Sequence, residues 1–393
     1  MISKENIVCI AYTTWGGDYV KSTVKLMGHL AKDNKLLFVE YPFTIKDVVF
    51  SFLKKQIADY KRILGLRSRL QRIKAFSGAE VYILTVPPGI PYAKIRNKAL
   101  LNFVLKINAA IIKPSIMKAM RKLQMDKPIV INTFNPFYGL HLAGKLREKL
   151  HLYYCYDAIS SDRYGDMGLI VEELFAKKTD GIIASSDMLK KIKSAYNSNC
   201  SVVKNGVDFA HFNDYYKTHT KKVQKKIGYI GSVDWRFEAE MISWVASKMP
   251  DYIFEIVGRI ANEEAKKILS SQANVKFHPP VSPNDVPAIM FNCDCGIIPY
   301  SRHEENKNVY PLKINEYLAV GTPVVMTDFA DLPEFNTLVG VASTKEEFLE
   351  AILHEISNNS AELEQRRVEF ASNNSWEARA DEFSNIIQSF INN

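Results

Sequence analysis

Lys313 and Glu316 have the types and the spacing needed to bind a nucleoside diphosphate. We expect a short helix that begins after Pro311 and stops at Gly321, followed by an apolar strand over 323–326. Free backbone amides at the start of such a helix, together with the Lys313 ammonium, bind phosphate groups. One turn further along, the Glu316 carboxylate accepts hydrogen bonds from a diol such as ribose. The alternative interpretation is a capped core helix before a buried strand, with no ligand.

Two predicted strand ends in the second half of the chain offer further phosphate contacts. Gly231 and Ser232 follow one expected strand, and Arg236 stands beside the start of the next helix. Arg259 follows the neighbouring strand in the same way. Glycine lets the backbone approach a phosphate closely, and Arg236, Arg259 and Lys313 would form a clamp that stabilises charge on a departing diphosphate. Because glycines are also common in structural turns after strands, a purely structural role is the alternative.

The composition is that of a globular protein with more than one domain. The chain has 393 residues, of which 47% are hydrophobic and 24% charged, and single cores stop growing at about 250–300 residues. We find neither a signal peptide nor a run of roughly 18 uncharged apolar residues, which predicts a cytoplasmic protein. The five cysteines and eight histidines show no ligand spacing, and Cys293 and Cys295 form a pair without partners. We therefore expect buried thiols, no metal ion and no other cofactor.

A basic region, residues 54–122, carries sixteen Lys or Arg against two acidic residues, Asp59 and Glu80. This excess is larger than the net charge of +8 of the whole chain. It predicts a polyanionic partner, which is anionic lipid, nucleic acid or a phosphorylated substrate. Apolar residues recur at near-helical spacing between Phe52 and Leu70, as in an interfacial helix or in an ordinary solvated helix face. Since nucleic-acid-binding patterns are missing, we expect an anionic membrane surface and no nucleic acid.

Strands and helices alternate in both halves of the chain, which predicts an α/β protein of two doubly wound, Rossmann-like domains. A polar segment, 212–226, is predicted to link the halves, and two helices are expected between Pro91 and Met125. Ligands of such sheets bind at the carboxyl ends of the strands, so we expect the domains to face a common cleft. The expected strands are 7–13, 36–40, 81–86, 129–132, 152–155, 181–184, 201–203, 227–230, 252–257, 275–277, 296–299 and 323–326.

The second half resembles the donor domain of GT-B glycosyltransferases, especially glycosyltransferase family 4 of bacterial capsule, cell-wall and lipopolysaccharide synthesis. In that family two Glu residues separated by seven others approach the donor sugar and the nucleotide ribose. Glu316 matches the second of them, whereas Asn308 stands at the first and brings no charge. The segments that carry the resemblance are 229–232, 257–259, 274–278, 294–300 and 311–321. The donor contacts that it implies are Gly231, Ser232, Arg236, Arg259, Asn308, Leu312, Lys313 and Glu316.

The first half is similar to the acceptor-binding domain of the same family. Asp157 follows an expected strand where relatives place a His or Asp, which makes it a candidate acid or base, with a helix cap as the alternative. Gly16 and Gly17 match a glycine loop near donor phosphate and acceptor. The domains that the resemblance implies are an acceptor-binding domain 1–208, a donor-binding domain 209–374 and a terminal helix in 375–393 that packs back on the first domain.

The function that the resemblance implies is transfer of a hexose from a nucleotide-diphosphate sugar to a hydroxyl of a membrane-linked glycan or lipid. The reaction would retain the anomeric configuration and serve cell-surface polysaccharide synthesis. The basic region would hold the protein on the inner face of the plasma membrane. Three alternatives stay open: an inverting transferase with Asp157 as base, a nucleotide-sugar 2-epimerase, and a nucleotide-binding subunit without catalysis. Asn308, in place of a carboxylate, motivates the last of these.

Overall fold

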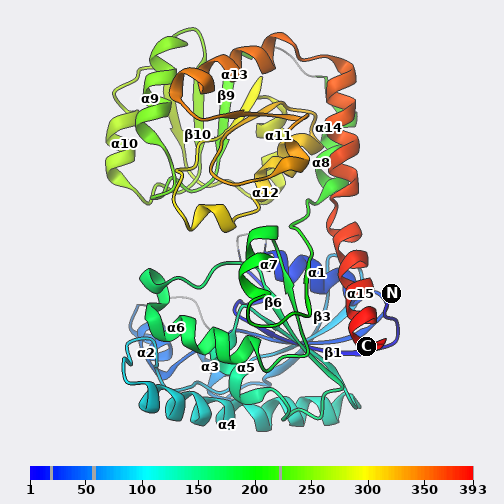
Figure 1. The fold of residues 1–393 in the computed structure, drawn as a ribbon. Helices are drawn as coiled ribbons and strands as arrows, with labels where there is room; N and C mark the ends of the chain where they lie inside the picture. Colours follow the sequence, from blue (N-terminus) through cyan, green and yellow to red (C-terminus); the bar gives the residue numbers. More distant parts are fainter. Residues whose placement is uncertain (18–20, 55–58, 221–223, 393) are drawn as a thin grey trace. The chain divides into compact units, whose positions relative to one another are not determined.

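The computed structural model describes residues 1–17, 21–54, 59–220 and 224–392, which form two compact units (Figure 1). Unit 1 consists of Met1–Lys204 and Arg379–Asn393, and unit 2 of Asn205–Ala378. The boundary predicted after residue 208 therefore lies inside unit 2. The terminal helix α15 (Trp376–Asn392) begins in unit 2 and continues into unit 1.

Unit 1 is built on an eight-stranded sheet with the order β3-β4-β2-β1-β5-β6-β7-β8. Its strands pair in parallel, except that β3 is antiparallel to β4. The strands are β1 (Asn6–Ala11), β2 (Lys35–Val39), β3 (Leu70–Lys74), β4 (Glu80–Leu84), β5 (Ile129–Thr133), β6 (Leu150–Cys155), β7 (Gly181–Ala184) and β8 (Cys200–Val202). The helices are α1 (Ser22–Leu30), α2 (Ile45–Lys54), α3 (Tyr60–Ile63), α4 (Lys98–Lys122), α5 (Pro136–Leu142), α6 (Ser161–Ala176) and α7 (Asp187–Lys193).

Unit 2 contains a six-stranded, wholly parallel sheet with the order β11-β10-β9-β12-β13-β14. The predicted fold class, two doubly wound α/β domains, is therefore confirmed. The strands are β9 (Lys226–Ile230), β10 (Ile253–Val257), β11 (Val275–His278), β12 (Cys295–Ile298), β13 (Val324–Thr327) and β14 (Val339–Ala342). The α-helices are α8 (Phe209–Thr218), α9 (Ala239–Lys248), α10 (Glu263–Leu269), α11 (Val286–Phe291), α12 (Leu312–Ala319), α13 (Lys345–Ser357) and α14 (Ala361–Asn373), and the short 3₁₀ turns are η1 (Pro283–Asp285), η2 (Asn306–Asn308) and η3 (Pro333–Phe335).

The basic region differs from the interfacial helix that was expected there. Helix α3 ends at Ile63, because Gly65 adopts φ +79° and turns the chain away from the helical path. Residues 70–74 then form β3, an edge strand that pairs with β4. Residues 55–58 of the expected helix lie outside the described residues. The interfacial prediction was therefore wrong for β3, whereas α2 and α3 are helical.

Helix α4 replaces the two helices expected before Met125. It continues through Pro114, because residues on both sides of this proline, such as Leu105 and Ile116, are buried in the core of unit 1. Such packing outweighs the helix-breaking tendency of proline. Among the described helices, α4 is the one whose length and apolar character would suffice to cross a membrane.

The first part of the segment predicted to link the halves, residues 212–218, is helical, and residues 221–223 lie outside the described residues. Helix α8 occupies residues 209–218, and Phe212 is buried in the core of unit 2. The linker prediction was wrong because most residues of α8 are polar, and its buried apolar contact with the core is made by Phe212.

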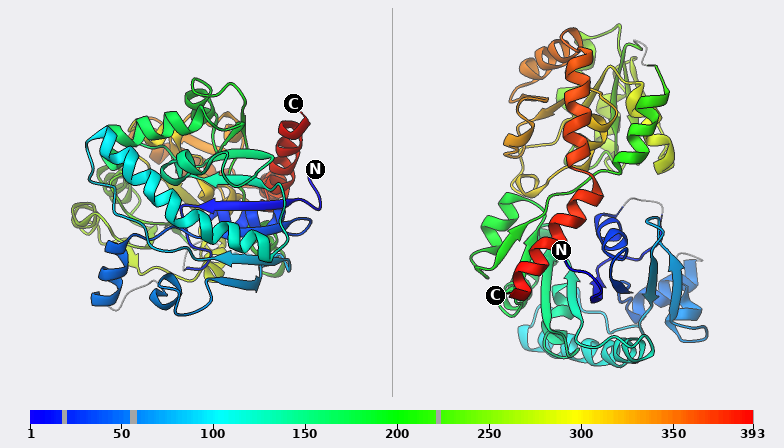
Figure 2. Two further views of the ribbon diagram at one scale, coloured as in Figure 1. Left: turned by 90° about the horizontal axis from the view of Figure 1, so that it is seen from below. Right: turned by 90° about the vertical axis from the view of Figure 1, so that its right-hand side faces the viewer.

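The chain ends of unit 1 lie together (Figure 2). The backbone amide of Ile2 donates to Ser384 Oγ at 2.9 Å. The ring of Phe383 packs edge-on against Tyr154 of β6, with centroids 5.3 Å apart. Helix α15 thus packs on the sheet of unit 1 through Phe383. At the other predicted helix, 19–31, α1 begins at Ser22, and residues 18–20 lie outside the described residues.

Candidate functional site

The strand order of unit 2 marks where a ligand would bind. The chain fills the sheet from β9 outward through β10 to β11, and then from β12 through β13 to β14 on the other side. The order reverses between β9 and β12, and such a switch point leaves a crevice at the carboxyl ends of the strands. Residues that follow β9 and β12, and the helix that follows β12, therefore surround the candidate site.

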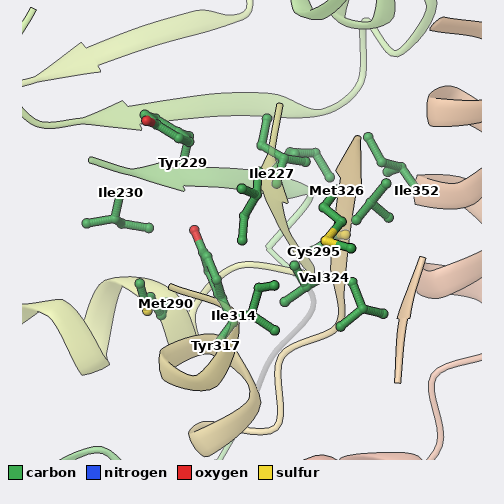
Figure 3. Close-up of a cluster of buried hydrophobic side chains, with 14 of the residues drawn as sticks. Ile227, Tyr229, Ile230, Met290, Cys295, Ile314, Tyr317, Val324, Met326 and Ile352 are labelled. Carbon is green, nitrogen blue, oxygen red and sulfur yellow. The ribbon is translucent and has the colours of Figure 1, made fainter. Parts of the chain in front are cut away.

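Helix α12 is fixed against this sheet by Tyr317 (Figure 3). The Tyr317 hydroxyl donates to the carbonyl of Gly228 at 2.7 Å. A Cβ atom at Gly296 would lie 2.6 Å from the Tyr317 ring, so only glycine leaves room for it. Tyr317 is fully buried, and its position sets the direction in which the first turns of α12 project.

Lys313, on the first turn of α12, lies over the turn that follows β9. A Cβ atom at Gly231 would lie 2.5 Å from Lys313 Cε and 3.1 Å from its Nζ. The turn is itself tight: Gly258 adopts φ +143°, and a Cβ atom there would lie 2.1 Å from the carbonyl oxygen of Gly231. These glycines let two strand ends and one ammonium group converge, which is the arrangement a diphosphate requires.

Glu316 lies one turn further along α12 and is half-buried. In the part of the chain that the structure describes, no hydrogen bond reaches its carboxylate. Burial raises the pKa of Glu316, and the nearby charge of Lys313 opposes this shift. A desolvated carboxylate beside a cation is ready to accept hydrogen bonds from a ligand diol.

The other residues predicted to contact phosphate differ in whether they already have partners within the protein. Arg236 makes a two-pronged ion pair with Asp234, with Nε to Oδ1 at 3.0 Å and Nη2 to Oδ2 at 2.6 Å. Burial would raise the pKa of Asp234, but hydrogen bonds and charge from Arg236 outweigh it and lower this pKa. Ser232 Oγ donates to the carbonyl of Arg259 at 3.2 Å, and the Arg259 side chain is exposed. The three predicted cations thus include one, Arg236, that already has an acidic partner.

Asn308 and Leu312 complete the predicted donor set. Asn308 ends η2 and is half-buried, and its Nδ2 donates to the carbonyls of Glu304 and Glu305, both at 3.4 Å. Leu312 is the first residue of α12 and is half-buried. The role of Asn308 toward a sugar stays a prediction. Sequence reasoning missed Asp234 and Tyr317, although an acidic residue two positions before Arg236 was a visible signal.

The site residues predicted in the first half all lie in unit 1. Asp157 follows β6, is half-buried, and its Oδ1 accepts a hydrogen bond from the Ala158 amide at 2.8 Å. Gly16 and Gly17 lie in the loop after β1, where Lys21 Nζ donates to Thr14 O at 2.8 Å and to Thr14 Oγ1 at 3.0 Å. Gly17 adopts φ +130°, which favours glycine. The loop is therefore held in one conformation by a lysine rather than left open.

Among the described residues, no three His, Cys, Asp or Glu side chains lie close enough together to hold a metal ion. The five cysteines are buried and form no disulfide with one another.

The chain resembles known proteins in its second unit by sequence and along its whole length by fold. Residues 224–358 match the family model Glycosyl transferases group 1, so the predicted resemblance is confirmed for the segment that carries Gly231, Lys313 and Glu316. TuaH of Bacillus subtilis (strain 168), whose name assigns it to teichuronic acid biosynthesis as a glycosyltransferase, is 32% identical over 164 residues. That match covers 39% of this chain and 41% of TuaH, which is less than half of either protein.

Solved structures extend the likeness to the whole chain. HepE of Anabaena, in complex with UDP, superposes with a TM-score of 0.64 at 14% identity, over 98% of this chain and 100% of HepE. Sucrose-phosphate synthase of Thermosynechococcus elongatus gives a TM-score of 0.70 at 13% identity, over 98% and 99% of the two chains. At these identities the likeness shows the fold, which is GT-B.

Proposed function

We propose that this chain is a GT-B glycosyltransferase that moves a sugar from a UDP-sugar to a hydroxyl of a membrane-linked glycan or lipid. The reaction retains the anomeric configuration and serves cell-surface polysaccharide synthesis on the cytoplasmic face of the membrane. The observation that carries the proposal is the position of Lys313 over Gly231, with Glu316 one turn along the same helix. The match of residues 224–358 to group 1 glycosyltransferases supports it.

The chemistry follows from these two side chains. When the bond between sugar and diphosphate breaks, negative charge grows on the leaving phosphate oxygen. Lys313 and the free amides at the start of α12 are placed to stabilise that charge, which lowers the barrier more than it tightens substrate binding. Glu316 would hold the ribose and so fix the diphosphate over the turn at Gly231.

Uridine is the nucleoside that we propose for the donor. HepE, which shares the fold, is known in complex with UDP. The direct test is a melting-temperature screen of the full chain with UDP, GDP, ADP and TDP, because a ligand that binds the native state raises its melting temperature. We expect UDP to give the largest increase, and no shift with any of the four would contradict the proposed donor site.

Turnover separates the proposal from its alternatives. We expect a UDP-sugar to be consumed when a glycan acceptor is supplied and the product to keep the anomeric configuration of the donor. An inverted product would point to Asp157 as a base, and an epimerised sugar without acceptor would point to a 2-epimerase. Tight UDP binding without any turnover would identify a nucleotide-binding subunit.

The membrane part of the proposal is supported by an exposed apolar face on α2. Ile45, Val49 and Leu53 recur on this helix and are 53%, 51% and 73% exposed. Leu66, beyond α3, is 72% exposed, and basic residues such as Lys61 and Arg67 are exposed nearby in the sequence. Apolar side chains interleaved with cations are typical of a surface that rests on anionic lipid.

Charge reversal tests this surface. We expect Lys61→Glu/Arg67→Glu to weaken binding to anionic vesicles at low salt by at least about 30-fold, since each basic residue contributes about 1 kcal/mol near such a membrane. The matched control is Lys266→Glu/Lys267→Glu on α10, which makes the same charge change in unit 2. Binding that is equal for both variants would contradict the surface, and added salt should weaken the wild-type binding.

A further inference from the structure

Unit 1 contains a cavity that the donor site does not use. Its volume is about 450 Å³, within the range of small-molecule pockets. The aromatic part of its wall comes from segments that follow different strands: Tyr12 after β1, Tyr41 after β2, Tyr92 after β4, and Phe137 after β5. Because the strand order of unit 1 reverses between β1 and β5, the cavity lies at the switch point of the first sheet.

The aromatic rings of the cavity pack against one another in two groups. Tyr12 meets Tyr41 edge-on, with centroids 5.1 Å apart. Tyr92 and Phe137 lie 5.1 Å apart, and Phe137 and Tyr164 lie 6.1 Å apart. These contacts fix the rings, so the wall is preformed rather than assembled by a ligand.

The backbone behind this wall is strained. Phe134, directly after β5, adopts φ +49°, which is an outlier for a bulky residue. Its ring packs edge-on against Tyr12 at 5.8 Å and Tyr164 at 6.1 Å. Strain of this kind persists where surrounding packing requires it, and here the Phe134 ring packs against two of the wall residues.

The wall carries hydroxyl groups with unused hydrogen-bonding capacity. Tyr92 is 8% exposed, and among the described residues its hydroxyl has no hydrogen-bond partner. Tyr41 is half-buried and also lacks one in that part of the chain. Burial, and then the proximity of neighbouring tyrosines, raises the pKa of Tyr92, so its hydroxyl stays protonated and able to donate. Neither hydroxyl oxygen is among the fully buried ones, so both are open to a polar ligand or to water.

Cations stand at the edge of the cavity. Lys46 and Lys94 line it and are exposed. Asp47, whose Oδ2 accepts from the amide and the hydroxyl of Thr44 at 2.7 Å, is the one acidic residue of the lining, so a net positive charge remains. The rim therefore favours an anionic group on the ligand.

The chemistry of wall and rim selects the class of ligand. A hydrocarbon chain would satisfy the aromatic faces but leave the phenol hydroxyls unpaired. A pyranose ring offers apolar C–H faces to the rings and hydroxyls to Tyr41 and Tyr92. We propose that this cavity binds one hexose ring with an anionic substituent, and that this ring is the acceptor sugar of the transfer reaction. The term acceptor rests on the proposed function, whereas the hexose site does not.

Binding of free sugars to the full chain tests the inference. The probes are glucuronate, glucose 6-phosphate, glucose and farnesyl phosphate, and saturation-transfer NMR detects the binding of each. We expect glucuronate or glucose 6-phosphate to bind more tightly than glucose, and comparison of the two tells whether a carboxylate or a phosphate is preferred. Tighter binding of farnesyl phosphate than of both anionic hexoses, or no binding of either of them, would overturn the inference.

Two variants assign the binding to this cavity. Tyr92→Phe keeps the ring and removes one hydroxyl, and we expect it to weaken hexose binding about 3- to 10-fold. Tyr82→Phe on β4, which does not line the cavity, is the matched control. Lys94→Gln should lower affinity for the anionic hexoses and leave glucose unchanged. Equal binding by Tyr92→Phe and Tyr82→Phe would exclude this site.

A parallel UDP titration separates this inference from the proposed function. Tyr92→Phe should bind UDP like the wild type, and Lys313→Ala should bind the hexose like the wild type. Hexose binding without UDP binding would leave the cavity assigned and the proposed function refuted. UDP binding and transfer without hexose binding would refute the cavity alone.

Discussion

Replacing Lys313 with alanine is expected to weaken UDP binding about 10- to 150-fold, which corresponds to a charge-assisted hydrogen bond of about 1.5–3 kcal/mol. The ammonium lies over the turn at Gly231, where a Cβ atom would be 3.1 Å from Nζ. The Tyr229 hydroxyl lies 3.1 Å from the same Cβ position, but it is neutral, so Lys313 supplies the positive charge at this turn. Isothermal titration calorimetry at fixed ionic strength measures the loss.

The control for Lys313→Ala is Lys276→Ala on β11. Lys276 is exposed, and its ammonium donates to the carbonyl of Ala273 at 3.0 Å. It has the same charge in the same unit but does not approach Gly231. Equal losses of UDP affinity in the two variants would mean that the effect is one of net charge and that the donor site lies elsewhere.

Glu316→Gln separates binding from stability. Burial raises the pKa of Glu316, so the folded protein keeps this proton to a higher pH than the unfolded chain. The contribution of this pKa shift to the free energy of unfolding is fully present below the unfolded pKa of about 4.3. It is lost as the pH rises through the higher pKa of the folded protein. At neutral pH the variant should therefore melt at a higher temperature than wild type and yet bind UDP about 10-fold more weakly. A lower melting temperature would contradict the desolvated carboxylate.

Local signals explain why helix α12 was predictable. Pro311 precedes its first turn, and Gly321 follows its end with φ +70°, so both ends are encoded within a few residues. The spacing of Lys313 and Glu316 on such a helix follows from its geometry alone. The contact between Lys313 and Gly231 does not, because it depends on how Tyr317 seats the helix on Gly228 and Gly296.

Features that depend on contacts between distant segments could not be predicted from the sequence. The segment at β3 has apolar residues at helical spacing, but β4 offers an open edge, and strand pairing decided the outcome. The cavity of unit 1 was invisible for a similar reason. Tyr12, Tyr41 and Tyr92 follow three different strands, and only the order of the sheet brings them together.

A buried ion pair in unit 1 gives the largest expected effect on stability. Lys193 Nζ donates to Glu172 Oε2 at 2.7 Å, and the two side chains are 4% and 1% exposed. The Tyr153 hydroxyl donates to the other oxygen of the same carboxylate at 2.8 Å. Both carboxylate oxygens are therefore paired, and removal of one partner leaves a charge that water cannot reach.

We expect Lys193→Met to destabilise unit 1 by about 3–5 kcal/mol, because the buried Glu172 carboxylate would lose the cation that compensates its burial. Urea unfolding of the full chain measures this change. Lys191→Met on the exposed side of α7 is the matched control and should change stability by less than about 0.5 kcal/mol. Adding Glu172→Gln to Lys193→Met removes the stranded charge and keeps an acceptor for Tyr153, so the double variant should regain most of the loss. A double variant as unstable as Lys193→Met would show that packing of the lysine stem, rather than its charge, stabilises this region.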